Sequence, residues 1–164
     1  MKVSEKTHTK ILDNMRLIVQ RVKNASVEVE NQIIGSINQG VLIYLGIENE
    51  DAQEDIDWLV KKVINLRIFA DEEDKMNLNI QEVEGEILVV SQFTLYASTK
   101  KGNRPSFTKA AKPELAKSLY EDFIETLKNA YLSNIQTGRF GANMQVESIN
   151  DGPLTFILDS KEKL

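Results

Sequence analysis

Alternating and continuously apolar stretches dominate the first part of the chain and predict strands. Residues 15–22 are rich in β-branched side chains, and residues 26–30 alternate between polar and apolar. Residues 33–37 and 41–47 follow after short polar connections. The stretch 41–47 is apolar throughout, which is typical of a strand buried on both faces. We therefore expect a group of closely spaced strands before the first helix.

Two later segments change to the helical period. Within residues 51–66 the apolar side chains fall on one helical face, and Asp51, Glu54 and Asp55 lie near its start, where the helix dipole favours negative charge. Pro113 suits the first turn of a second helix. That helix continues with apolar residues at helical spacing, namely Leu115, Leu119, Phe123 and Leu127.

The remaining strand patterns determine the predicted fold class. Residues 86–96 form the strongest strand pattern, and strands at 145–150 and 154–159 flank the turn residues 151–153. Strands that follow each other closely, with only two main helices, predict a mixed α/β (α+β) domain with a largely antiparallel, barrel-like sheet. No GxGxxG or P-loop sequence occurs, which disfavours a doubly wound nucleotide fold.

The chain length fits a single domain, since domains cluster near about 100–150 residues. Met15 opens the first strand pattern, whereas residues 1–14 are mostly polar. We therefore interpret residues 1–14 as an N-terminal extension, either upstream of a start at Met15 or an ordered accessory tail, and residues 15–164 as the domain.

The absence of two residue types restricts the chemistry of this domain. The chain has no cysteine, and its one histidine, His8, lies in the expected extension. Residues 15–164 therefore cannot supply a Ser-His-Asp or Cys-His nucleophile system, nor a zinc site of Cys/His type. The acidic run 71–74 is expected to be solvated, because no second cluster completes a metal shell. We expect no metal and no cofactor.

Charge and hydropathy limit the cellular compartment and the classes of partner that we expect. The absence of cysteine suits a reducing cytoplasm, and no apolar run approaches the roughly 20 residues that cross a bilayer, so we expect a cytoplasmic protein. The net charge of −5 argues against nonspecific coating of nucleic acid, and no DNA partner is expected. A basic cluster without acidic residues nevertheless lies between Thr99 and Pro113, and it is either a phosphate-binding surface or a solvated loop. It comprises Lys100, Lys101, Arg104, Lys109 and Lys112.

Polar residues interrupt the apolar strand pattern near its end, at Ser91, Gln92 and Thr94. They either satisfy backbone groups where the strand stops, or form the floor of a pocket beside released backbone N–H groups. Thr94 has no histidine or amine to deprotonate it and would be a weak nucleophile, so we expect it to orient a substrate.

The segment 150–155, Asn-Asp-Gly-Pro-Leu-Thr, also has two interpretations. It is either a tight turn between two strands or a backbone element that approaches a ligand closely, which glycine permits.

Taken together, six segments occur in the order found in D-aminoacyl-tRNA deacylases, and the sequence resembles that family from residue 15 to about residue 159. The family usually has valine where this chain has Leu154, a change that keeps an aliphatic side chain. The segments are 15–22 (Met-Arg-Leu-Ile-Val-Gln-Arg-Val), 25–27 (Ala-Ser-Val), 45–47 (Leu-Gly-Ile), 91–95 (Ser-Gln-Phe-Thr-Leu), 102–107 (Gly-Asn-Arg-Pro-Ser-Phe) and 150–155.

The resemblance implies a homodimeric hydrolase. Such an enzyme cleaves the ester between a D-amino acid and the 3′ adenosine of tRNA, accepts glycyl-tRNA mischarged on tRNA(Ala), and rejects L-aminoacyl-tRNA. By similarity, the catalytic pocket that holds the aminoacyl-adenosine end is lined by Ser91, Gln92, Phe93 and Thr94.

The resemblance also assigns the substrate filter to the partner subunit. Gly152 and Pro153, joined by a cis peptide in the family, would face the pocket of the other chain, hold the substrate's amino group through main-chain oxygens, and leave no space for an L side chain. Arg21 would brace this segment, and Asn150 would belong to the same substrate-binding element. Contacts with tRNA are expected from Lys100, Lys101, Arg104 and Phe107.

The family's mechanism does not require a histidine. The resemblance implies that the 2′-hydroxyl of the terminal adenosine assists the attacking water, so the protein would supply positioning and oxyanion stabilisation, with the Phe93 N–H as a candidate donor. Three other readings stay open: a nucleic-acid-binding module without catalysis, an esterase or thioesterase acting on another acyl substrate, and a purely structural dimer.

Overall fold

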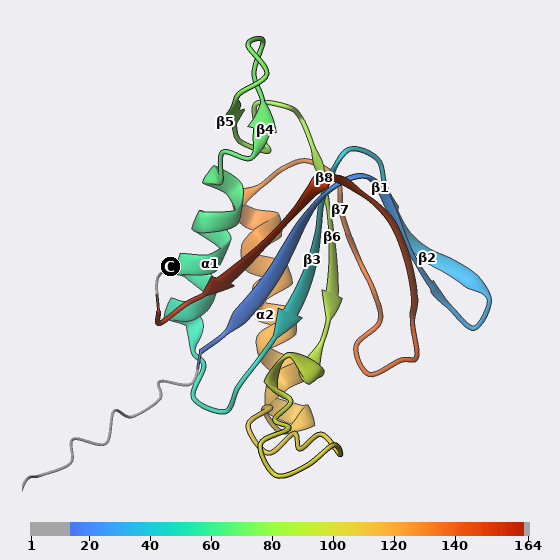
Figure 1. Cartoon of the computed structure of the whole chain (residues 1–164), viewed down its shortest axis with the longest axis vertical. Helices are drawn as coiled ribbons and strands as arrows, with labels where there is room; N and C mark the ends of the chain where they lie inside the picture. Colours follow the sequence, from blue (N-terminus) through green and yellow to red (C-terminus); the bar gives the residue numbers. More distant parts are fainter. Residues whose placement is uncertain (1–13, 163–164) are drawn as a thin grey trace, which may run out of the picture.

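The computed structural model describes residues 14–162 (Figure 1). Of the expected extension 1–14, only Asn14 belongs to this range, and it is buried; the rest lies outside the described residues. The elements in chain order are β1 (Arg16–Val29), β2 (Gln32–Ile37), β3 (Gly40–Gly46), α1 (Gln53–Asn65), β4 (Phe69–Ala70), β5 (Met76–Leu78), β6 (Glu86–Ser91), the short 3₁₀ helix η1 (Phe93–Tyr96), α2 (Pro113–Ala130), β7 (Ile135–Thr137) and β8 (Gln145–Asp159).

Strand β1 organises the main sheet. Along one edge it pairs antiparallel with β3 and then β2, and along the other it pairs antiparallel with β8. Strands β3 and β6, and β6 and β7, pair in parallel because each connection crosses over through a helix. The expected mixed α/β domain with a barrel-like sheet and two main helices is confirmed, and the two parallel pairings are an addition that the sequence did not predict.

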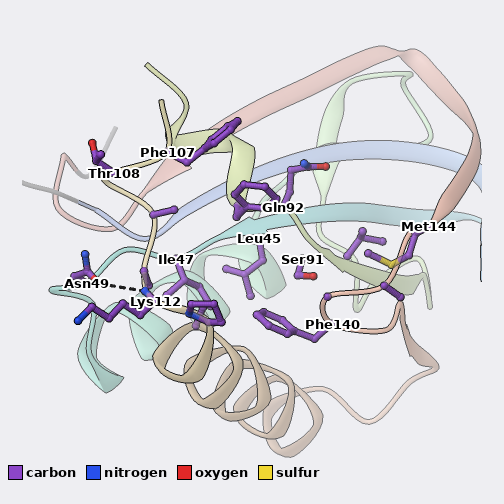
Figure 2. A pocket seen from close by; sticks show the side chains of 18 of the residues that line it. Leu45, Ile47, Asn49, Ser91, Gln92, Phe107, Thr108, Lys112, Phe140 and Met144 are labelled. Carbon is purple, nitrogen blue, oxygen red and sulfur yellow. Dashed lines mark hydrogen bonds between the residues drawn. The ribbon is translucent and has the colours of Figure 1, made fainter. Parts of the chain in front are cut away.

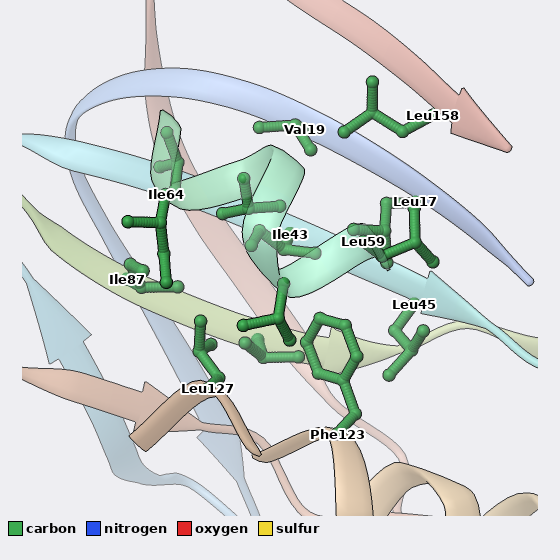
Figure 3. Packing of buried hydrophobic residues seen from close by; sticks show 14 of the residues in the cluster. Leu17, Val19, Ile43, Leu45, Leu59, Ile64, Ile87, Phe123, Leu127 and Leu158 are labelled. Carbon is green, nitrogen blue, oxygen red and sulfur yellow. The ribbon is translucent and has the colours of Figure 1, made fainter. Parts of the chain in front are cut away.

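Helices α1 and α2 lie side by side and cover one face of the sheet (Figure 1). Alternate strand residues such as Leu17, Ile43 and Ile87 point toward this layer and pack with Leu59 and Phe123 (Figure 3). All five of these side chains are fully buried. The layer between the sheet and the helices is the larger of the two cores among the described residues.

The opposite face of the sheet curls over a second, smaller core. Leu88 and Val90 of β6 join Leu42 of β3 and Val27 of β1 there. Strand β6 is therefore buried on both faces, which explains why residues 87–90 are all apolar.

Two pairs of expected strands are in fact single strands. The segments expected at 15–22 and 26–30 are parts of the continuous β1, which spans Arg16–Val29, and residues 145–150 and 154–159 belong to the continuous β8. The expectation of a turn between two strands at 151–153 is therefore wrong: these residues form a bulge within β8. The hairpin β4–β5 and the short β7 were not predicted.

The strand expected over 86–96 ends at Ser91, and η1 follows. Gly46 makes room for η1, because a Cβ atom there would lie 3.1 Å from Leu95 Cβ and 3.0 Å from Tyr96 Cε2. The end of β3 thus sets the point at which the neighbouring β6 turns away from the sheet.

Candidate active site

A cavity of about 760 Å³ lies where β3 and β6 end and α2 begins (Figure 2). This volume falls within the range of small-molecule sites, about 300–1,000 Å³. Its lining is mostly apolar and includes Leu45, Ile47, Phe93, Phe107, Phe140 and Met144. A smaller polar set completes it: Asn49, Ser91, Gln92, Thr108 and Lys112.

The polar strand end contributes three of its four expected residues to this cavity. Ser91 and Gln92 are half-buried lining residues, and the exposed Phe93 lines the cavity as well. Thr94 is exposed and does not line it, although its hydroxyl accepts a hydrogen bond from the Gln92 side-chain amide. Thr94 therefore lies beside the cavity, where its side chain is open to a second molecule.

Backbone donors become free at this strand end. The Gln92 N–H donates to the Leu45 carbonyl over 2.8 Å. This is the last backbone hydrogen bond that continues the pairing of β6 with β3. Phe93 and Thr94 then begin η1, and the first N–H groups of a helix have no partner within it. Within residues 14–162 neither N–H has an acceptor, so two unused donors lie beside the cavity.

Tyr96 fixes η1 to the sheet. Its hydroxyl donates to the carbonyls of Asn14 and Gly46, and the Arg16 guanidinium lies 5.6 Å from its ring centroid. Burial raises the pKa of Tyr96 far above its ordinary value, so the hydroxyl keeps its proton for these bonds. The backbone donors of η1 therefore rest on a fixed support.

The apolar wall of the cavity was not predicted from the sequence. Phe140 and Met144 come from the loop after β7, and Val146 comes from the start of β8. No motif marks these residues, because only the curling of the sheet brings this loop beside Ser91 (Figure 2).

The basic cluster flanks one side of the cavity. Ser98 and Ser106 exchange two backbone hydrogen bonds, of 2.8 and 2.9 Å, and close a loop that carries the exposed side chains of Lys100, Lys101 and Arg104. The Lys112 N–H donates to Asn49 Oδ1 over 3.2 Å, drawn as the dashed line in Figure 2.

The Gly-Pro segment is a bulge on β8. Gln20 pairs with Thr155 and Val22 pairs with Asn150, so four residues, 151–154, lie opposite Arg21 alone. The Asn150 side chain closes the base of the bulge: its Oδ1 accepts from the Leu154 N–H over 3.0 Å, and its Nδ2 donates to Thr155 Oγ1 over 3.2 Å. Asn150 therefore shapes this segment.

Gly152 and Pro153 form the tip of the bulge. Both are exposed, and the peptide between them is cis. Gly152 has φ +130°, and a Cβ atom at this position would lie 2.9 Å from Leu154 Cγ and 3.4 Å from Arg21 Nη2. Only glycine suits this combination of a positive φ and a crowded site.

Arg21 anchors the bulge to the body of the protein. Its Nη1 donates to the buried Ile68 carbonyl over 2.7 Å, its Nε donates to the Asp151 carbonyl over 3.3 Å, and the same Nε lies 3.1 Å from Asp151 Oδ2. The guanidinium fork thus joins β1, the segment after α1, and the bulge.

The bulge and the cavity lie apart within one chain. Leu45 pairs with both Leu17 and Ser91, so Arg21 and its bulge lie four residues, or about 13 Å, farther along the strands. Three inter-strand steps of about 4.8 Å separate β8 from β6. In agreement with this separation, neither Gly152 nor Pro153, both of them described, lines the cavity.

The described residues contain no group of three or more His, Cys, Asp or Glu placed to hold a metal ion. Between residues 14 and 162, no helix has the length and apolar character needed to cross a membrane. The polar lining of the cavity comprises hydroxyls, side-chain amides and Lys112, with backbone donors beside it and apolar walls around it.

Comparison with known proteins assigns this arrangement to one family. The sequence model of the family described as D-Tyr-tRNA(Tyr) deacylase matches residues 18–159. A D-aminoacyl-tRNA deacylase of Bacteroides thetaiotaomicron is 60% identical over 149 residues, which cover 91% of this chain and 99% of the relative. One of Flavobacterium johnsoniae is 56% identical over the same length and shares.

Two solved structures share the fold. One, described as a c-Myc DNA unwinding element binding protein, has a TM-score of 0.83 and 43% identity, and the match covers 88% of this chain and 97% of that one. The other, described as a probable eukaryotic D-amino acid tRNA deacylase, has a TM-score of 0.77 and 19% identity, with 89% and 99% covered. At that identity the second likeness concerns the fold alone.

Proposed function

The chain belongs to the D-Tyr-tRNA(Tyr) deacylase family, and we propose that it is a cytoplasmic, homodimeric proofreading enzyme whose active site is shared between two subunits. Its reaction is the hydrolysis of the ester that joins a D-amino acid to tRNA. Glycyl-tRNA mischarged on tRNA(Ala) is a second substrate in this proposal, and L-aminoacyl-tRNA is rejected.

The separation of the bulge from the cavity supports the shared site. Gly152 and Pro153 are exposed at the tip of a braced bulge, yet they lie too far along the sheet to reach Ser91 of their own chain. A second copy of the chain can bring its bulge to the cavity. The exposed Thr94 then lies at the junction of the two chains.

In this arrangement the bulge acts as the stereochemical filter. Its main-chain oxygens hold the amino group of the substrate, and its backbone occupies the space that an L side chain would need. Arg21 maintains the shape of the bulge through its bonds to Ile68 and Asp151. A rigid wall rejects the wrong stereoisomer without any catalytic side chain.

The chemistry relies on positioning and on the backbone donors of η1. Ser91 and Gln92 hold the aminoacyl-adenosine end in the cavity, and the Phe93 N–H stabilises the oxyanion that forms when water attacks the ester carbon. The 2′-hydroxyl of the terminal adenosine assists the water. A substrate that ends in 2′-deoxyadenosine should therefore react much more slowly, whereas Thr94→Ala should retain most activity.

The basic loop extends the site toward the tRNA. Lys100, Lys101 and Arg104 are exposed on one loop, and Phe107 follows it at the cavity. Exposed cations at such an edge contact phosphates and make binding sensitive to salt.

The experiment that tests this function pairs two substrates that differ only in chirality. The same tRNA is charged with D-tyrosine or L-tyrosine, and release of the amino acid is followed with the purified protein. Hydrolysis of the D-ester alone supports the proposal. Binding of both tRNAs without cleavage would favour a nucleic-acid-binding module, and cleavage of simple acyl esters without tRNA would favour another esterase.

A further inference from the structure

Two aromatic side chains are left exposed at the cavity. Of the six phenylalanines, all of which are described, only Phe93 and Phe107 are exposed, at 58% and 38%. Their ring centroids lie 5.0 Å apart with an interplanar angle of 65°, in an edge-on arrangement. Exposed aromatic side chains forgo the burial that stabilises a core, so their place at the rim of a cavity indicates a ligand.

The ring of Phe107 is attached to the basic loop. It follows directly after Ser106, whose two hydrogen bonds with Ser98 close the loop of Lys100, Lys101 and Arg104. No acidic residue occurs between Thr99 and Pro113. One rigidly closed loop therefore presents both an aromatic ring and three cations.

Single-stranded nucleic acid has the complementary chemistry. Its phosphates match the cations, and its bases stack on aromatic rings regardless of sequence because every base has a π-face. The edge-on contact with Phe93 orients Phe107 and covers at most one of its two ring faces. Phe93 and Phe107 are exposed, whereas Phe140 and Met144, which form the apolar wall on another side of the cavity, are half-buried (Figure 2).

We propose that Phe107 stacks on the base of the nucleotide that precedes the terminal adenosine. This inference rests on the proposed deacylase function, in which the terminal adenosine occupies the cavity. Phe107 is then a positioning residue for the substrate: it holds the single-stranded 3′ end of the tRNA, while the loop cations hold its phosphates. The enzyme reads two nucleotides, the second of them by stacking.

The test compares esters of two lengths. D-Tyrosyl-adenosine presents the terminal nucleotide alone, the D-tyrosyl ester of the dinucleotide CpA adds one base, and an abasic version of the dinucleotide keeps the phosphate without that base. Stacking of one base corresponds to roughly a 5- to 150-fold effect on binding. The kcat/KM of the wild-type protein should therefore be higher for CpA than for the abasic dinucleotide by about this factor. The difference between CpA and D-tyrosyl-adenosine should be slightly larger, because it also includes the contribution of the phosphate.

The variants separate stacking from general loss of structure. Phe107→Leu removes the ring but keeps an apolar side chain, and it should abolish the preference for CpA, so that kcat/KM falls much further for CpA than for D-tyrosyl-adenosine. Phe107→Tyr keeps a ring and should keep the preference. Leu115→Ala is the matched control, because Leu115 is equally exposed, at 38%, and does not line the cavity. It should change neither value.

A spectroscopic signature accompanies the kinetics. With 2-aminopurine in place of the penultimate base, fluorescence should be quenched on binding to the wild type and to Phe107→Tyr but not to Phe107→Leu. If Phe107→Leu lowers kcat/KM equally for both lengths, or if the abasic dinucleotide matches CpA, the stacking proposal is wrong. If the wild type cleaves neither D-ester, the deacylase function fails and this proposal fails with it.

Discussion

Replacing Arg21 with alanine should uncouple the bulge of β8 from the rest of the protein. The change removes a 2.7 Å hydrogen bond to the Ile68 carbonyl, a 3.3 Å hydrogen bond to the Asp151 carbonyl and an ion pair with Asp151. It also leaves the carbonyl of the buried Ile68 without its guanidinium donor. The bulge then keeps only the bonds made by Asn150 at its base.

The magnitude follows from these contacts. A hydrogen bond to a charged group contributes about 1.5–3 kcal/mol, and the longer bond counts for less. The Arg21 side chain is 14% exposed but that of Asp151 is 36% exposed, so solvent screening limits the ion pair to at most about 1 kcal/mol. We expect a total loss of about 2–4 kcal/mol, which corresponds to roughly a 30- to 900-fold change in an equilibrium or rate ratio.

The assay measures kcat/KM for D-tyrosyl-tRNA and L-tyrosyl-tRNA with each variant. Arg21→Ala should lower the D-to-L ratio by up to this factor, and Arg21→Lys should fall between it and the wild type because lysine keeps the charge without the fork. Arg67→Ala is the matched control. Arg67 Nε donates to the Asn77 carbonyl over 2.8 Å on an exposed part of the surface.

The control should keep the wild-type ratio. A wild-type D-to-L ratio in Arg21→Ala, in a protein that is folded by circular dichroism, would contradict a role of Arg21 in shaping the filter, because the filter would then hold its shape without this side chain. A loss of activity on both esters in equal proportion would also contradict it.

Three further predictions concern the backbone donor, the basic loop and a buried phenol. Phe93→Pro removes the N–H at the first position of η1, where proline is tolerated, and should lower kcat by about 10²- to 10³-fold, whereas Phe93→Ala keeps the N–H and should lower kcat far less. Lys100→Glu combined with Lys101→Glu should raise the KM for tRNA and flatten its salt dependence; an unchanged slope would make the loop a solvated one. Burial raises the pKa of Tyr120 to about 12 from an ordinary value of 10. The stability that its neutral hydroxyl contributes is therefore complete below pH 10 and is lost as the pH rises to 12. When the free energy of unfolding is measured by denaturant titration at each pH, Tyr120→Phe should make its decrease between pH 10 and 12 smaller.

Much of the fold was predictable from local patterns. The apolar run 41–47 and the helical period of 51–66 each correspond to one element, and Pro113 begins α2 as expected. Local patterns failed where tertiary structure decides the conformation. Residues 93–96 have strand-like side chains, but they form η1 because β3 ends at Gly46 and leaves no strand to pair with.

In the candidate site, too, some residues could be predicted from local patterns and others only from the tertiary structure. Ser91 and Gln92 could be identified because polar residues interrupt an apolar strand, and the structure places both at the cavity. Phe140 and Met144 carry no such signal, since apolar residues in a loop become a cavity wall only after the sheet has curled. Turn residues 151–153 were assigned to a connection, because nothing local shows that pairing with β1 continues on both sides of them.

Mixed dimers can determine whether each active site is shared between two subunits. Arg21→Ala and Phe93→Pro chains carrying different affinity tags are co-expressed, and the dimer that bears both tags is assayed for D-selective deacylation. If the bulge of one chain serves the cavity of the other, one of the two sites in this dimer is intact, and about half of the wild-type activity should return with wild-type chirality. If each chain contains its own complete site, the mixed dimer will show only the average of the two defective homodimers, and the active site is then not shared.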